Sequence, residues 1–149
     1  MTRFLLSLDE AVDLILDAAA NAKPGETYIP RVPSANIIDL ANTLIGERDI
    51  EIVETAVRPG EKLHECMIPV DEARQTLEFD DHFVIEPASA SWPRNADWIS
   101  QGVPCPNGFC YSSDNNTHWL TKAELQEMIR PFAEAAAEST NTPPQQSAA

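Results

Sequence analysis

The octapeptide Arg58–Glu65 (RPGEKLHE) constrains this chain more than any other segment, because it directly follows the β-prone run Ile50–Val57. Proline fixes φ at one position of a tight turn, and glycine accepts the positive φ that the next position of a type II turn requires. The sequence therefore predicts a strand over residues 50–57 that ends in a Pro-Gly turn. That turn would hold Arg58 and Glu61 in a fixed relation on a loop.

The residue types on this turn suit a phosphorylated sugar ligand. A guanidinium grips phosphate oxygens with a planar fork of donors, and a carboxylate three residues away can accept hydrogen bonds from a sugar diol. Together Arg58 and Glu61 suit a nucleotide diphosphate, with one group for the pyrophosphate and the other for the ribose. The simpler alternative is a surface ion pair across the turn, worth roughly 0–1 kcal/mol. Spacing alone favours that ion pair.

The charge balance excludes several classes of partner. The chain carries 10 basic and 24 acidic residues, a formal net charge of −14. A nucleic acid or an anionic membrane surface requires a basic face, which this chain lacks. No apolar run approaches the roughly 20 residues of a membrane helix, and Asp9 and Glu10 lie too near the start for a signal peptide. We therefore expect a cytoplasmic protein that binds neither nucleic acid nor membrane.

Capping signals and hydrophobic periodicity predict the helices. Two helices open on capping boxes, at Ser7–Glu10 and at Thr121–Glu124, and the second of these is expected to pause at Pro131. Two further helices are predicted: one capped by Ser34 and a short one over residues 70–75. The predicted ranges are residues 8–22, a helix from Ser34 that Gly46 ends, residues 70–75, and a helix from Thr121 through Ile129.

The remaining segments read as strands, a long irregular stretch and a tail. A short strand is predicted over residues 27–29, and another over 77–85 that Asp80 and Asp81 interrupt. Residues 86–108 contain four prolines and follow no clean period, which indicates an irregular segment. Together with the helices, these strands place the chain in the mixed α/β class.

Motifs that carry chemistry are absent from this chain. It has no glycine-rich nucleotide loop. Its two tyrosines, Tyr28 and Tyr111, are followed four residues later by Val32 and Asn115, so a Tyr-x-x-x-Lys catalytic pair is missing. We therefore assign no catalytic residue and no cofactor-binding residue, and expect no chemistry from this chain alone.

The cysteines do not indicate a disulfide framework or a metal site. Cys66, Cys105 and Cys110 are odd in number, which does not suggest a set of disulfides. The Cys105–Cys110 spacing could close around a metal together with a histidine, but zinc sites usually show two short pairs of ligands and only one pair exists here. We expect reduced thiols and assign no metal ligand.

Several motifs, taken in order, resemble the carboxy-terminal part of the UDP-N-acetylglucosamine 4,6-dehydratases. These enzymes form the polysaccharide-biosynthesis branch of the extended short-chain dehydrogenase/reductases. The resemblance covers about residues 2–129, and its RPGEKLHE and YSSDNN segments are quite specific. The motifs are Thr2-Arg3-Phe4, Leu8–Val12, Arg58–Glu65, Asp71–Arg74, Tyr111–Asn116 and Trp119-Leu120.

The resemblance implies roles for three residues. In this family the arginine of the Arg-Pro-Gly-Glu turn typically grips the pyrophosphate of a UDP-sugar and the acidic residue takes the ribose hydroxyls; these roles carry over to Arg58 and Glu61. An earlier arginine that commonly contacts phosphate carries over to Arg3. The fold implied is an incomplete one: a sugar-nucleotide-binding lobe over residues 1–130, followed by a helix end and disordered tail over 131–149.

The family's amino-terminal Rossmann half, with NADP and the catalytic residues, has no counterpart in this sequence. Met1 would then be an internal methionine used as a start, in a truncated product or in a subunit completed by a separate chain; an oligomer is expected of the complete enzyme. Three functions remain open: part of a UDP-N-acetylhexosamine 4,6-dehydratase, part of a UDP-sugar 4-epimerase, or a non-catalytic acidic module that binds a protein partner.

Overall fold

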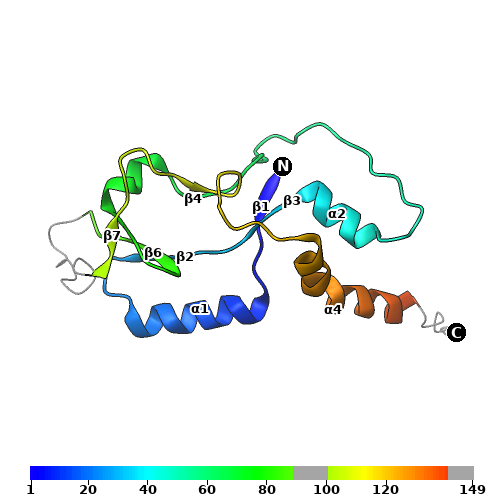
Figure 1. Cartoon of the computed structure of the whole chain (residues 1–149), viewed down its shortest axis with the longest axis horizontal. Helices are drawn as coiled ribbons and strands as arrows, with labels where there is room; N and C mark the ends of the chain where they lie inside the picture. Colours follow the sequence, from blue (N-terminus) through cyan, green and yellow to red (C-terminus); the bar gives the residue numbers. More distant parts are fainter. Residues whose placement is uncertain (89–100, 141–149) are drawn as a thin grey trace, which may run out of the picture.

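The structure is a computed structural model that describes residues 1–88 and 101–140, and it confirms the mixed α/β class (Figure 1). Short strands and three α-helices follow one another along these residues. The elements are β1 (Thr2–Phe4), α1 (Leu8–Asn21), β2 (Thr27–Pro30), β3 (Ser34–Asn36), α2 (Ile37–Ile45), β4 (Cys66–Ile68), the 3₁₀ helix η1 (Val70–Gln75), β5 (Thr76–Glu78), β6 (His82–Ile85), β7 (Val103–Pro104), β8 (Tyr111–Ser112) and α4 (Lys122–Thr140).

The main sheet has four strands in the order β2-β6-β5-β7, all paired antiparallel. Two small two-stranded sheets, β1-β3 and β4-β8, lie beside it along the molecule (Figure 1). The hydrophobic core joins the main sheet to β4 and β8. Its buried members are Ile29, Ile68, Phe83, Ile85, Cys105 and Tyr111, with Phe4, Met67 and Phe109 packed against them.

Helix α1 begins as its sequence predicts but buries none of its residues. The Ser7 side chain accepts from the Glu10 backbone N–H, and the Glu10 carboxylate accepts from the Ser7 N–H, a complete capping box. Leu8, Ile15 and Leu16 are 80%, 67% and 63% exposed. The helix therefore presents a large apolar face that nothing in the described chain covers.

The predicted start of the second helix was wrong. Ser34 belongs to β3, where it is fully buried and its backbone bonds to His118 and Leu120. Asn36 caps α2 instead, accepting from the Ile38 N–H. Pairing with distant strands commits Ser34 to an extended backbone, which moves the helix start by two residues. Gly46 ends α2 as predicted, with a φ of 59°.

The predicted strand over residues 50–57 is also absent: this segment has no regular structure and is exposed throughout. Figure 1 shows the chain after α2 as a long arc that returns toward β1. A strand needs an edge to pair with, and β propensity alone does not supply one. No strand of the described chain pairs with this segment.

The strand predicted over residues 77–85 is a hairpin. Asp80 and Asp81 form the turn between β5 and β6, and the Phe79 N–H donates to the His82 carbonyl across it. The short helix predicted over 70–75 is confirmed as η1. Within the stretch predicted to be irregular, β7 adds an edge strand to β5, and residues 89–100 lie outside the described residues.

Helix α4 opens on the predicted capping box and packs against α2. It continues through Pro131 without the predicted pause and reaches Thr140. Of the predicted helix end and disordered tail over residues 131–149, residues 131–140 belong to this helix, and residues 141–149 lie outside the described residues. None of the described helices combines the length and apolarity needed to cross a bilayer.

Candidate functional site

The Arg58–Glu61 turn has the geometry that its Pro-Gly pair predicts. The Glu61 N–H donates to the Arg58 carbonyl at 3.0 Å, and Gly60 adopts a φ of +83°, as the third position of a type II turn requires. The Glu61 carboxylate accepts from the Arg58 N–H at 3.0 Å, which closes the turn a second time. Glu61 therefore fixes the conformation of the arginine beside it.

The side chains of Arg58 and Glu61 do not form the ion pair that spacing alone favoured. Among the described residues, neither a hydrogen bond nor an ion pair engages the Arg58 guanidinium, and the residue is exposed. Glu61 uses one carboxylate oxygen, Oε2, for the backbone and keeps Oε1 for another donor. The turn thus presents a guanidinium and a carboxylate oxygen to solvent.

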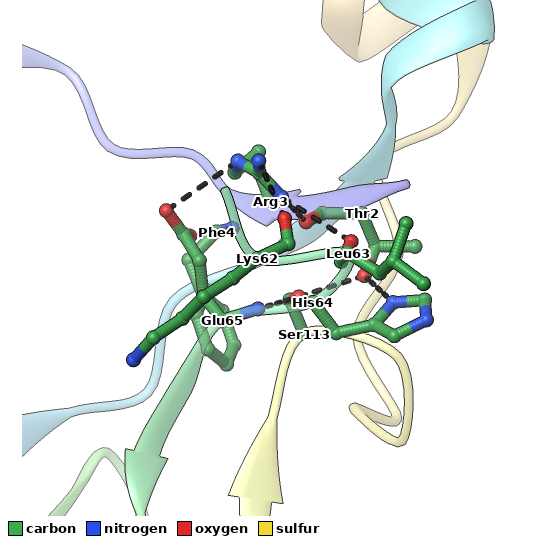
Figure 2. Close-up of polar contacts among 8 residues, drawn as sticks. All are labelled: Thr2, Arg3, Phe4, Lys62, Leu63, His64, Glu65 and Ser113. Atoms are coloured by element: carbon green, nitrogen blue, oxygen red, sulfur yellow. Dashed lines mark hydrogen bonds and ion pairs between the residues drawn. The ribbon is translucent and has the colours of Figure 1, made fainter. Parts of the chain in front are cut away.

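Arg3, from β1, holds the segment that follows this turn (Figure 2). Its guanidinium donates to the carbonyls of Lys62 at 2.9 Å and Leu63 at 3.3 Å, and to its own neighbour Thr2 at 2.7 Å. Its Nε lies 3.7 Å from the Glu65 carboxylate. The resemblance implies a phosphate contact for Arg3, whereas most of its donors here are hydrogen-bonded to backbone carbonyls at the base of the turn.

A chain of hydroxyl and imidazole groups joins three segments beneath the turn (Figure 2). The Thr2 hydroxyl is hydrogen-bonded to His64 Nδ1 at 2.8 Å and to the Ser113 hydroxyl at 2.7 Å. Ser113, which is fully buried, also accepts from the Glu65 N–H at 2.9 Å. We call Thr2, His64, Glu65 and Ser113 the anchor network, because it ties β1 and the residues after β8 to the end of the RPGEKLHE segment.

Backbone bonds reinforce the same joint. The Thr2 N–H donates to the Leu63 carbonyl at 3.0 Å, and the Ser113 N–H donates to the Glu65 carbonyl at 2.8 Å. The Glu65 carboxylate accepts from the Phe4 N–H at 2.9 Å. Residues 62–65 are therefore fixed on both sides, while residues 58–61 project from this base.

The YSSDNN segment is structural in this fold. The buried Tyr111 hydroxyl donates to the Val32 carbonyl and accepts from the Val32 N–H, each at 3.0 Å. Asn116 donates to the Val32 carbonyl at 2.8 Å and to the Ser34 hydroxyl at 3.0 Å. A hydrogen bond from Ser112 holds the pKa of Asp114 below its usual value. The segment thus ties β8 to the chain between β2 and β3.

Sequence reasoning missed the anchor network. It assigns no role to Thr2, His64 or Ser113, although all three lie within the motifs that carry the resemblance. The contacts join residues 62 and 111 positions apart, and no local pattern indicates them. Among residues 1–88 and 101–140, no group of three acidic, histidine or cysteine side chains is arranged to hold a metal ion.

Comparisons with known proteins agree with the resemblance. The family model described as "Polysaccharide biosynthesis protein" matches residues 1–87. A UDP-N-acetylglucosamine 4,6-dehydratase (inverting) of Campylobacter jejuni is 37% identical over 134 residues, which are 87% of this chain and 40% of that protein. A UDP-glucose 4-epimerase of Rickettsia massiliae is 33% identical over 131 residues, 87% of this chain and 38% of that protein.

A solved structure shows the same fold. The X-ray structure of Pen from Bacillus thuringiensis superposes with a TM-score of 0.69 at 31% identity, over 89% of this chain and 38% of that one. The chain thus spans about two fifths of the length of the relatives it matches. The matched family model covers more than half of the sequence, including the Arg58 turn and its base: the chain belongs to the polysaccharide biosynthesis protein family.

Proposed function

We propose that this chain is the carboxy-terminal, UDP-sugar-binding lobe of a cytoplasmic UDP-N-acetylhexosamine 4,6-dehydratase that serves surface-polysaccharide biosynthesis. The observation that carries the proposal is the Arg58–Glu61 turn, which presents a guanidinium without a partner among the described residues, from a base fixed by the anchor network. Preorganised donors bind an anion without the entropic cost of ordering a loop. The Campylobacter jejuni dehydratase, 37% identical, supports the choice of reaction.

Each site residue has a distinct role in this proposal. The Arg58 guanidinium donates to the pyrophosphate, and Glu61 Oε1 accepts from a ribose hydroxyl while Oε2 keeps the turn closed. Arg3 Nη2 donates one N–H to the Lys62 carbonyl and its second N–H to the same phosphate. The other donors of Arg3 hold the base of the turn. All three residues bind substrate; none of them carries out a chemical step.

The rest of the active site is supplied by a further polypeptide segment, which we place against α1. The chain covers 40% of the dehydratase relative. The uncovered face of α1, with Leu8, Ile15 and Leu16 each more than 60% exposed, is of the kind that packs against another domain. That segment would hold NADP, which would supply reversible hydride transfer at the sugar, while Arg58, Glu61 and Arg3 of this chain would hold the UDP portion. The complete enzyme is proposed to be an oligomer.

Calorimetry with UDP and with pyrophosphate tests the site in the complex reconstituted with the complementing segment. Arg58→Ala should weaken UDP binding by roughly 1.5–3 kcal/mol, the range for hydrogen bonds to charged groups. Glu61→Ala should weaken UDP binding by less, and pyrophosphate binding less still. Arg48→Ala is the matched control, because Arg48 is an exposed arginine whose side chain, within the part of the chain that the structure describes, bonds to the α2 carbonyls of Leu44 and Ile45.

Three results would contradict this assignment: unchanged UDP affinity in Arg58→Ala, an equal loss in Arg48→Ala, or equal weakening of both ligands by Glu61→Ala. Negligible effects from both site variants would favour the third function left open by the sequence, an acidic module that binds a protein partner. The isolated chain should form no 4-keto-6-deoxy sugar from UDP-N-acetylglucosamine and NADP, since it has no glycine-rich loop and no Tyr-x-x-x-Lys pair.

A UDP-sugar 4-epimerase is the second candidate, and the 33% identity to the Rickettsia massiliae epimerase favours it. Both reactions begin from a bound UDP-sugar, whose pyrophosphate and ribose are the same, so the Arg58 turn serves either one. The product of the reconstituted complex separates them. Loss of water identifies the dehydratase, whereas a UDP-sugar of unchanged mass with inverted C4 identifies the epimerase.

A further inference from the structure

Two cysteines that lie far apart in the sequence meet at the edge of the anchor network. Cys66 is the first residue of β4, and Cys110 directly precedes β8. The two strands pair antiparallel, with Cys66 opposite Ser112 and a shift of register before Ile68. Because of this arrangement the two Sγ atoms lie 3.6 Å apart, although 44 positions separate the residues in sequence.

Both thiols of this pair can be reached from solvent, and the third cysteine cannot. Cys66 is exposed and Cys110 is half-buried. Cys105 is only 7% exposed, belongs to the hydrophobic core, and has no sulfur within bonding distance in the described chain. The fold therefore separates the three cysteines into one accessible pair and one buried thiol.

We propose that Cys66 and Cys110 are a modification site: a dithiol that small-molecule disulfides oxidise to an intramolecular cross-link between β4 and β8. Closing the bond requires the sulfurs to approach from 3.6 Å to about 2.05 Å. The pairing of β4 with β8 holds the two backbone segments beside each other, which favours closure over pairing with a distant thiol. This inference concerns the chain itself and does not depend on the proposed function.

The chemistry proceeds by two exchanges. One thiolate of the pair attacks a sulfur of oxidised glutathione, forms a mixed disulfide and releases one glutathione thiolate. The second cysteine, after losing its proton to water, attacks the protein sulfur of that mixed disulfide and releases the second glutathione. Two protein thiols are thereby oxidised and one glutathione disulfide is reduced to two thiols.

The environment of the Cys66 thiol determines the rate of this exchange reaction. Burial, the hydrogen bond with Cys110 and the negative charges of Cys110 and Asp114 together raise the pKa of the Cys66 thiol to about 11, although the nearby Lys62 acts in the opposite direction. Since the thiolate is the attacking species, oxidation should accelerate as the pH rises. The cross-link would join β4 to β8 directly beside Glu65 and Ser113, so it braces the base of the Arg58 turn.

Oxidised glutathione, added in excess to the purified chain, provides the test. Thiol counting under denaturing conditions should fall from three to one, with a mass loss of two hydrogens. Fragmentation of the non-reduced peptides should show Cys66 joined to Cys110. Cys105→Ser should form the same bond at the same rate, while Cys66→Ser and Cys110→Ser should yield no intramolecular disulfide.

The unfolded chain gives the decisive contrast. Loop entropy favours closure of the short Cys105–Cys110 loop over closure of the much longer Cys66–Cys110 loop. In urea the dominant product should therefore be Cys105–Cys110, and only the fold should redirect pairing to Cys66. Cys105–Cys110 as the main native product, retained glutathione adducts, or dimers linked through Cys66 would each overturn the proposal.

Discussion

Ser113→Ala should release the end of the RPGEKLHE segment without disturbing the rest of the fold. Ser113 is fully buried, and its hydroxyl accepts from the Glu65 N–H at 2.9 Å while bonding to the Thr2 hydroxyl at 2.7 Å. Alanine removes both bonds. Thr2 keeps His64 as a partner, so the Glu65 N–H is the group left without one.

A buried donor left without an acceptor costs about 1–3 kcal/mol. We take about 2 kcal/mol, the middle of this range, because the bond is part-buried although its acceptor Ser113 is completely enclosed. Since each 1.4 kcal/mol is a factor of ten, the protection of this amide against hydrogen exchange should fall about 30-fold in Ser113→Ala. Amide exchange followed by mass spectrometry or NMR measures this local opening directly.

Two further variants separate this mechanism from a general loss of stability. Thr2→Val removes the hydroxyl that bonds Ser113 and His64 but leaves the acceptor of the Glu65 N–H in place, so Glu65 should keep most of its protection. Ser112→Ala, at the neighbouring position, removes a bond to the exposed Asp114, where water can replace the hydroxyl. An unchanged Glu65 exchange rate in Ser113→Ala would refute the reasoning.

Three other predictions follow from single features of the fold. Ser7→Ala should lower the stability of α1 by about 1 kcal/mol at neutral pH. Because hydrogen bonds with Ser7 lower the Glu10 pKa below 4.5, part of the stability difference between variant and wild type should disappear as the pH falls from 4.5 through that lowered pKa. Tyr111→Phe should lower the free energy of unfolding in urea by about 1–3 kcal/mol, since the Val32 N–H loses its acceptor while the Val32 carbonyl keeps Asn116 as a donor. The exposed apolar face of α1 should make the isolated chain self-associate, and Ile15→Glu should reduce this self-association in sedimentation. Unchanged self-association in Ile15→Glu would show that this face takes no part in it.

Local signals in the sequence predicted local structure well. The capping boxes at Ser7 and Thr121 and the Pro59-Gly60 turn are formed by bonds between residues three positions apart, so the sequence contains both partners. Gly46 as the end of α2 belongs to the same group. Short-range backbone bonding decides each of these features, and the residue types alone indicate them.

The errors concern features that depend on distant partners. Ser34 looked like a helix cap but pairs with β1, and residues 50–57 looked like a strand but meet no edge in the described chain. The hydroxyl chain from Thr2 to Ser113 and the approach of Cys66 to Cys110 arise only when the chain brings remote segments together. Nothing in the local sequence around any of these residues reports on its partner.

The anchor network also has a consequence for the order of folding. Thr2 meets His64 across 62 positions and Ser113 across 111, so it cannot complete its contacts until nearly the whole described chain has been synthesised. The hydrogen bonds within helix α1 and those between β5 and β6 join residues close in sequence, so they can form before the anchor network does. During synthesis the Arg58 turn could therefore form early, but its base would become rigid only after residue 113 had left the ribosome.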